Sequence, residues 1–281
     1  MVTNRRRDQL LDKATLFAQT DLTCPEMFDM VSGQVLVFTH RSPAKETVNE
    51  DCAALIPYDE ANGVLVIADG LGGLPSGSTA SKIAVARLKK SIEKAAQEQT
   101  PLREAILDGI ERANQDILAQ GSGAATTIAV VEIQHDRMRP YHVGDSMILL
   151  CGQRGKQKLL SVAHSPVGYA VESGMLDVDE AVHHEERHIV SNVVGAPDMR
   201  IEIGAARRIA KLDTLILASD GLFDNLYLDE IVDIIRKGDL QTTALRLLEL
   251  TRQRMNQPRS ELPSHPDDLT FILYRRNPAA Q

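Results

Sequence analysis

The 281-residue chain carries 31 Lys and Arg against 39 Asp and Glu, a formal net charge of −8, and 43% of its residues are hydrophobic. This composition is typical of a soluble globular protein and excludes a wholly disordered chain, a collagen-like fibre and a disulfide scaffold. The acidic balance and the low aromatic content of 4% disfavour binding to duplex nucleic acid, stacked bases or an anionic membrane. The surplus carboxylates are either spread over the surface or gathered at one site.

Cysteine usage and the lack of long apolar runs bear on location. The three cysteines, Cys24, Cys52 and Cys151, are far apart and form no Cys-x-x-Cys pair, which predicts reduced thiols. No apolar run approaches the roughly 18 residues of a membrane span, and the arginines at 5–7 precede acidic residues rather than an apolar stretch. We therefore expect a cytoplasmic protein with neither a membrane nor a nucleic acid as partner.

In chain order, the pattern first predicts an N-terminal extension over residues 1–30, made of a polar helix and a linker, and then one domain over 31–276. Apolar runs at 35–38, 52–56 and 64–68 predict strands, and the turn residues at 59–63 make the last two a hairpin. Apolar stripes predict helices over 78–96 and from Pro101 to Ile117. Strands are expected again at 126–133, 138–143, 147–151 and 158–162.

The second half of the chain begins with a polar, irregular segment over 163–188. Strands are expected at 200–203, 214–218 and 269–274, and helices at 228–236 and after a capping residue, Asp239. Strands thus come in clusters and helices in pairs, unlike the strict alternation of a parallel sheet. The sequence predicts an α+β fold in which helix pairs cover antiparallel sheets.

Carboxylates recur where the predicted strands enter or leave the core. Asp is disfavoured beside buried strands unless it is paired or binds a cation. A single Asp-Gly step is more often a turn, but hard divalent ions take carboxylate and carbonyl oxygens, and several strand-end Asp residues can build a two-metal hydrolytic site. The strand-end set comprises Glu50, Asp51, Asp69, Asp145, Asp220, Asp267 and Asp268.

Six short motifs, in order, resemble those of the type 2C, metal-dependent Ser/Thr protein phosphatases of bacterial type. They are N-E-D at 49–51, A-D-G-L-G-G at 68–73, A-T-T at 125–127, H-V-G-D-S at 142–146, S-D-G-L-F-D at 219–224 and D-D-L-T at 267–270. The resemblance covers residues 35 to 274. It implies an α-β-β-α sandwich of two antiparallel sheets flanked by helix pairs, with metals in a cleft at one edge and a flap over about 163–188.

The resemblance also implies a role for each site residue. Asp69 would bridge two Mn²⁺ or Mg²⁺ ions, and the carbonyl group of Gly70 would bind one of them. Asp220 and Asp267 would hold the first ion. Asp69 and Asp220 are therefore the expected catalytic residues, in a reaction where a metal-activated water attacks phosphorus directly.

The second ion would take Glu50 and Asp51, partly through water, and Asp145 together with Asp220 would favour a weaker third ion. Two departures from the family pattern concern the substrate phosphate. The usual Arg, four residues before the first Glu, is Glu46 here, and the neighbouring Lys45 offers a point charge instead of a bidentate fork.

Asp268 stands in place of the terminal Asn of the family motif and adds negative charge near the phosphate. We expect Lys45 and Asp268 to lie at the substrate phosphate. These departures leave open an alternative, a weakly active or pseudo-phosphatase that binds phosphoproteins as a regulator.

A further alternative is a zinc peptidase, because His184, Glu185 and His188 fit the H-E-x-x-H motif. A strand-like run follows at 189–194 and no long amphipathic helix precedes, which disfavours this alternative. The leading hypothesis is a signalling enzyme that hydrolyses phosphoserine and phosphothreonine in proteins. Its expected partners are phosphorylated proteins and a cognate Ser/Thr kinase.

Overall fold

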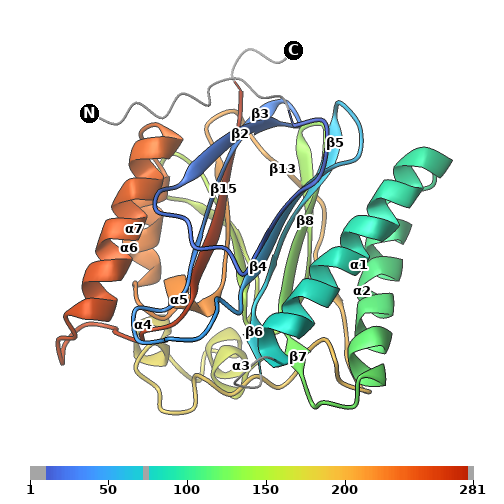
Figure 1. The fold of residues 1–281 in the computed structure, drawn as a ribbon. Helices are drawn as coiled ribbons and strands as arrows, with labels where there is room; N and C mark the ends of the chain where they lie inside the picture. Colours follow the sequence, from blue (N-terminus) through green and yellow to red (C-terminus); the bar gives the residue numbers. More distant parts are fainter. Residues whose placement is uncertain (1–10, 72–75, 278–281) are drawn as a thin grey trace.

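The computed structural model describes residues 11–71 and 76–277, in which two antiparallel sheets lie face to face between pairs of helices (Figure 1). The first sheet has the order β1 (Thr15–Ala18), β4 (Cys52–Pro57), β5 (Asn62–Ala68), β8 (Ile128–Gln134), β9 (Arg137–Val143) and β12 (Glu202–Ile203), and β13 (Arg207–Arg208) also pairs with β9. The second sheet has the order β11 (Gln157–Leu160), β10 (Met147–Cys151), β14 (Thr214–Ala218), β15 (Leu269–Arg276), β3 (Gly33–His40) and β2 (Glu26–Met30).

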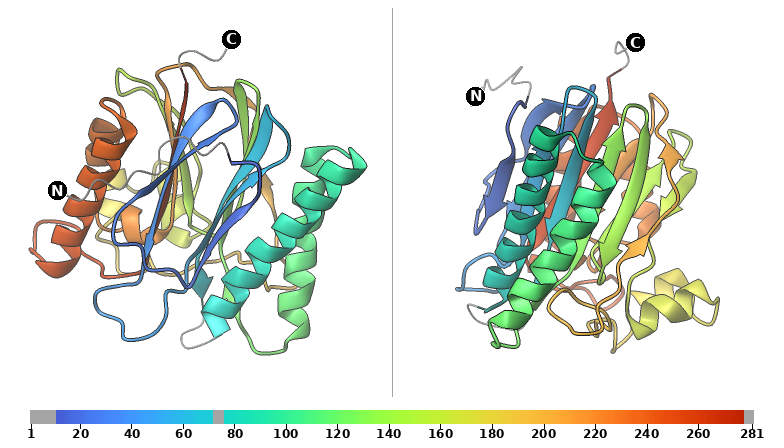
Figure 2. Two further views of the ribbon diagram at one scale, coloured as in Figure 1. Left: turned by 45° about the horizontal axis from the view of Figure 1, so that its top comes forward. Right: turned by 90° about the vertical axis from the view of Figure 1, so that its right-hand side faces the viewer.

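Helices cover both outer faces of the sandwich. The first sheet carries α1 (Ser76–Glu98) and α2 (Leu102–Ala119), which lie side by side in Figure 2, and the second carries α6 (Leu228–Ile235) and α7 (Leu240–Asn256). Buried side chains form three clusters, one between the two sheets and one under each helix pair. The predicted α-β-β-α class is therefore confirmed.

Burial on both faces explains why the central strands are almost continuously apolar. In β4, Ala53 and Leu55 point into the cluster between the sheets, whereas Ala54 and Ile56 point toward α1 and α2. Such strands lack the apolar–polar alternation of a half-exposed sheet. The predicted hairpin at 52–68 is confirmed, because β4 and β5 pair antiparallel.

The predicted helices are also present. On α1, Ala84, Leu88 and Ile92 recur every four residues and are fully buried. The backbone N–H of Thr242 donates to the side chain of Asp239 at 2.9 Å, so the predicted cap of α7 is confirmed.

Two secondary-structure predictions are wrong. Residues 15–18 and 26–30, predicted within a helix and linker, form the edge strands β1 and β2, and Phe17 and Met30 are buried between the sheets. Edge strands are short and half-exposed, so their polar residues mask the strand pattern. The segment 163–188, predicted to be irregular, contains the short helices α3 (Pro166–Glu172) and α4 (Val178–Ala181). Residues 1–10 lie outside the described part of the chain.

Among the helices of the described ranges, none combines the length and apolar character needed to cross a membrane.

Candidate metal centre

The strand-end carboxylates meet at one edge of the sandwich. Cys52 pairs with Ala68 in the first sheet, which places Asp51, just before β4, beside Asp69, just after β5. In the second sheet, Ala218 pairs with both Met147 and Phe271, so the residues flanking β10, β14 and β15 reach the same edge. Asp145, Asp220 and Asp267 lie in these flanking positions. The structure thus brings together carboxylates that are more than 200 residues apart in sequence.

Several of these carboxylate oxygens are buried without a hydrogen-bond partner. Glu50 and Asp51 are only 7% and 1% exposed. Oε1 of Glu50, Oδ1 of Asp51 and Oδ1 of Asp220 accept no hydrogen bond from the described residues. A buried carboxylate oxygen without a partner is costly unless a cation neutralises it. A set of hard oxygen donors is the type that Mg²⁺ and Mn²⁺ prefer, so the residues present fit these ions.

The pKa values of the same groups point to a concentrated negative charge. Burial, and then the charge of Asp268, raises the pKa of Asp51 to about 7. Burial likewise raises the pKa of Asp145 to about 6. Burial and the neighbouring carboxylates raise the pKa values of Asp69 and Asp220 well above their ordinary range. Like charges that perturb one another in this way are typical of a site built around cations.

The motif around Asp51 has a structural explanation in the surrounding hydrogen bonds. The side chain of Asn49 accepts the backbone N–H of Asp51 at 3.0 Å, and the hydroxyl of Ser219 donates to Oδ2 of Asp51 at 2.8 Å. The hydroxyl of Ser81, on α1, donates to the carbonyl of Glu50 at 2.6 Å. The carboxylate of Asp51 is therefore oriented from both sheets, with Oδ1 left unbonded.

Asp69 is held through its backbone. The hydroxyl of Thr126 and the N–H of Thr127 both donate to the carbonyl of Asp69, at 2.6 and 2.8 Å. Gly70 begins the short strand β6 (Gly70–Leu71), which pairs with β7 (Ala125–Thr126). A Cβ on Gly70 would collide with the carbonyl of Gly77, so only glycine allows this approach.

A histidine holds the turn that carries Asp145. Gly144 has φ +102°, its N–H donates to Nδ1 of His164 at 3.1 Å, and its carbonyl accepts the backbone N–H of His164 at 3.0 Å. Because Nδ1 accepts this hydrogen bond, the proton of the neutral ring is on Nε2, which donates to Glu202 at 3.1 Å. Nothing in the sequence pattern singled out His164 or Glu202, because β12 and the turn meet only in the fold.

His142, His164 and Glu202 each bring a ligand atom within 4.8 Å of the other two. The carboxylates of the candidate centre form no such group among the described residues, so their division between ions is left to the proposal below. Nε2 of His142 is 2.8 Å from the carbonyl of Val162, which can only accept a hydrogen bond, so Nε2 is the donor. Nε2 of His142 and both ring nitrogens of His164 are therefore occupied by hydrogen bonds to other protein groups, and we interpret the group as a support for the Gly144 turn rather than a metal site.

Lys45 and Asp268, predicted at the substrate phosphate, form one ionic network at the rim. Nζ of Lys45 lies 2.8 Å from Glu50, 3.0 Å from Asp268 and 3.7 Å from Asp267. The buried carboxylate of Asp268 also accepts the backbone N–H groups of Ser42 and Glu50, both at 2.7 Å. Asp268 thus ties the loop after β3 to β15, and its predicted contact with phosphate stays a prediction.

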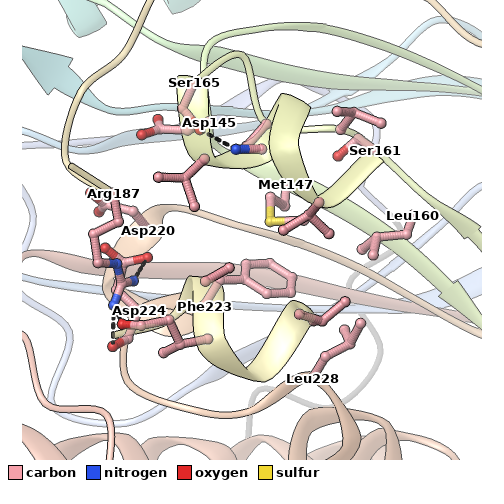
Figure 3. Close-up of a pocket in the computed structure, with 18 of the residues that line it drawn as sticks. Asp145, Met147, Leu160, Ser161, Ser165, Arg187, Asp220, Phe223, Asp224 and Leu228 are labelled. Atoms are coloured by element: carbon pink, nitrogen blue, oxygen red, sulfur yellow. Dashed lines mark hydrogen bonds and ion pairs between the residues drawn. The ribbon is translucent and has the colours of Figure 1, made fainter. Parts of the chain in front are cut away.

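A cavity of about 270 Å³ opens beside the carboxylates, between α3 and α4 on one side and α5 (Asp220–Phe223) and α6 on the other (Figure 3). Its walls are largely apolar, with Asp145 and Asp220 at one end. Arg187 forms an ion pair with Asp224 at that end and donates to the carbonyl of Val182 at 2.5 Å. Arg187 was not among the predicted site residues, because only the fold brings its segment to Asp220.

The H-E-x-x-H motif does not form a metal-binding helix. The last helix before it, α4, ends at Ala181, and residues 184–188 form irregular structure and turns. In the described ranges, neither His184 nor His188 belongs to a group of three potential ligands. The two histidines lie on neither a helix nor a strand, so no regular element brings them to a common face and the zinc-peptidase alternative is not favoured.

Gly221 offers a test of the close packing beneath Asp220. A Cβ at this position would collide with the carbonyl oxygen of Asp268 at the start of β15. We expect Gly221→Ala to lower the free energy of unfolding by about 2–4 kcal/mol, measured by urea denaturation. Gly152→Ala is the control and should change little, because its Cβ would approach the flexible end of Lys158 at 3.2 Å and its other neighbours only at ordinary van der Waals distances of 3.6 Å or more. Equal effects of the two substitutions would contradict the packing argument.

A two-sheet sandwich with buried carboxylates converging at one edge defines a candidate metal-dependent hydrolase. Residues 40–261 match the family model described as protein phosphatase 2C. The chain belongs to the protein phosphatase 2C family, and the predicted family is confirmed.

Individual relatives agree with this assignment. The chain is 30% identical over 199 residues to protein phosphatase PhpP of Streptococcus pneumoniae, covering 68% of this chain and 80% of the relative. It is 25% identical over 243 residues to serine/threonine phosphatase stp of Listeria welshimeri, covering 82% and 90%. The structure of the S. agalactiae serine/threonine phosphatase aligns with a TM-score of 0.74 at 26% identity, covering 87% of this chain and 100% of that one.

Proposed function

We propose that this chain is a metal-dependent protein serine/threonine phosphatase that hydrolyses phosphoserine and phosphothreonine in proteins. The observation that carries the proposal is the set of buried carboxylates from both sheets, three of which keep an unpartnered oxygen. Membership of the protein phosphatase 2C family and the names of the bacterial relatives support the same activity. The pseudo-phosphatase alternative is not favoured, since the candidate carboxylates are all present and converge.

For the ions, we propose two Mn²⁺ or Mg²⁺, with a weaker third. Asp69 would bridge the two, with the Gly70 carbonyl on one of them, and Asp220 and Asp267 would complete the first position. A related catalytic domain, PstP, has been solved in complex with two manganese ions, which supports manganese for this chain. The bound ions supply a water of lowered pKa and neutralise the phosphoryl oxygens.

At the second position we propose Glu50 and Asp51, and at the third Asp145 with Asp220. The ring of His164 keeps the Gly144 turn, and hence Asp145, in place. Lys45 is proposed to contact the substrate phosphate, since its ammonium lies at the rim within 3.7 Å of Asp267. Its attraction to Glu50 would weaken once that carboxylate serves an ion, which would leave the ammonium available to the phosphate.

The proposed substrates are phosphorylated proteins, and a Ser/Thr kinase whose products the enzyme dephosphorylates is a proposed partner. We also propose that the enzyme acts in the cytoplasm. The distant cysteines support this location, and in the structure Cys24, Cys52 and Cys151 are free thiols.

The decisive experiment measures phosphate release from a phosphothreonine peptide and from p-nitrophenyl phosphate, with Mn²⁺ added and after EDTA treatment. We expect turnover with Mn²⁺ and its loss with EDTA, restored when excess Mn²⁺ returns. Turnover that survives EDTA would overturn the metal-dependent mechanism. Tight phosphopeptide binding without turnover would instead indicate a pseudo-phosphatase.

A further inference from the structure

A second pocket, distinct from the cavity under α3, borders the metal centre on the side of α7. It has a volume of about 360 Å³ and lies where the ends of β3 and α7 meet the start of β15. Asp267, a proposed ligand of the first ion, forms part of its wall. A group held in this pocket would therefore lie next to a phosphate held at the ions. Its lining includes Phe38, Arg41, Arg252 and Asp267.

The distinctive feature of this pocket is the guanidinium group of Arg252. It lies over the ring of Phe38, with Cζ 5.3 Å from the ring centroid, and it is only partly exposed. Partial burial lowers the pKa of Arg252, although an arginine stays charged at neutral pH. Within the described ranges the guanidinium forms no ion pair and donates no hydrogen bond, whereas the next arginine on α7, Arg254, pairs with Glu230 at 2.6 Å. A partly desolvated cation without an anion is costly, and an external anion would offset that cost.

A second cation, Arg41, also lines the pocket. The side chain of Arg41 is 44% exposed, and its Nε lies 3.4 Å from Asp21. Its Nη1 is 3.5 Å from the carbonyls of Glu46 and Thr47, at the limit of a hydrogen bond. Such long contacts leave most of its donors available to a ligand. The carboxylate of Asp267 repels an anion, but its charge would be neutralised by the ion it is proposed to hold.

We propose that this pocket binds an anionic side chain of the phosphoprotein substrate, a carboxylate or a second phosphate, next to the residue being dephosphorylated. The inference rests on the proposed function, since it places the pocket beside the scissile phosphate. A guanidinium matches both carboxylate and phosphate geometry with two parallel hydrogen bonds. An extended peptide advances about 3.3 Å per residue, so the anion would lie within about three residues of the phosphorylated one. The pocket would thus select substrates with clustered acidic or phosphorylated residues.

The test uses a set of phosphothreonine peptides that are neutral elsewhere, each with one Glu or one phosphoserine placed between positions −3 and +3. We expect one placement to raise kcat/KM of the wild-type enzyme about tenfold, the size of one charge-assisted hydrogen bond. Arg252→Gln should abolish that gain, so that the anionic and the neutral peptide are hydrolysed with the same kcat/KM. Peptide affinity is measured in parallel by fluorescence anisotropy, so that the preference is tested even where turnover is slow.

The matched control is Arg246→Gln, which removes the same charge from an exposed position of α7 outside the pocket. Arg246→Gln should keep the preference for the anionic peptide. A preference that survives Arg252→Gln, falls equally in both variants or never occurs in the wild type would overturn the inference. Hydrolysis of every peptide at one rate would overturn the inference while leaving the proposed function intact. If no peptide is hydrolysed, the phosphatase activity fails, and the anisotropy measurement still decides the binding preference. Binding of inorganic phosphate alone, without any preference among the peptides, would count against a substrate subsite.

Discussion

Asp69→Asn is expected to lower Mn²⁺-dependent turnover of p-nitrophenyl phosphate by about 10³-fold or more, a loss of several kcal/mol of transition-state stabilisation. Asp69 is the carboxylate proposed to bridge two ions, and Thr126 and Thr127 hold its backbone, so the side chain at position 69 should keep its place in the variant. The amide of Asn offers one neutral oxygen where two charged oxygens stood. Steady-state assays over a range of Mn²⁺ concentrations measure the effect.

Folding and catalysis can be separated for this variant. Burial and the charges of Asp51 and Asp220 raise the pKa of Asp69, so the ionised carboxylate destabilises the metal-free fold. Metal-free Asp69→Asn should therefore be at least as stable as the metal-free wild type at pH 7.5, measured by thermal unfolding. Asp233→Asn, which removes an exposed carboxylate from α6, should keep full turnover. Activity of Asp69→Asn near the wild-type level would refute the role assigned to Asp69.

The location of the carboxylates was predictable because strand ends leave a local trace. A buried apolar run that stops at Asp-Gly is visible in sequence at Asp69 and Asp220 alike. Antiparallel pairing then brings the ends of strands that are far apart in sequence to one edge, as the pairing of Ala218 with Phe271 illustrates. The sequence could therefore identify the members of the set, but not the distances between them.

Other parts of the site had no local trace. Arg187, His164 and Arg252 acquire their surroundings only through contacts with residues that are distant in sequence, such as Asp224, Glu202 and Phe38. The polar residues of the edge strands β1 and β2 hide their strand pattern, so the sequence wrongly predicts a helix and a linker there. The sequence shows that positions 45–46 and 268 depart from the family pattern. It does not show that Lys45 and Asp268 contact each other. A carboxylate at 268 accepts two backbone N–H groups and also pairs with the ammonium of Lys45.

The net charge of −8 acquires a structural meaning from the same cluster. The seven strand-end acids, Asp268 included, lie at one edge, so the excess is concentrated rather than spread over the surface. Lys45 offsets part of it at the rim, and bound cations would offset more. An acidic protein can therefore bind phosphate-bearing partners at this edge, despite the repulsion expected from its overall charge.

The metal-free protein is expected to become less stable as the pH rises from 5.5 to 7.5, and Mn²⁺ should remove this trend. Burial raises the folded-state pKa of Asp51 to about 7, whereas the unfolded carboxyl titrates near 3.8. Between these values the folded state binds more protons than the unfolded state, so stability falls with pH until Asp51 is ionised. Asp145, with a pKa of about 6, adds to the loss in the lower half of the window. His142 acts in the opposite direction below about pH 6.5, since burial lowers its pKa.

The expected loss from Asp51 alone is on the order of 2 kcal/mol over these two pH units, or roughly 5 °C in melting temperature. With saturating Mn²⁺ the carboxylates are held ionised in the folded state, as they already are in the unfolded state, so these groups no longer change their proton number on unfolding and the melting temperature should stay nearly constant with pH. Differential scanning fluorimetry across the pH range, with EDTA and with Mn²⁺, measures both slopes. Asp51→Asn should flatten the metal-free slope, and Asp233→Asn should keep it. Parallel slopes with and without Mn²⁺ would contradict the assignment of these carboxylates as the metal ligands.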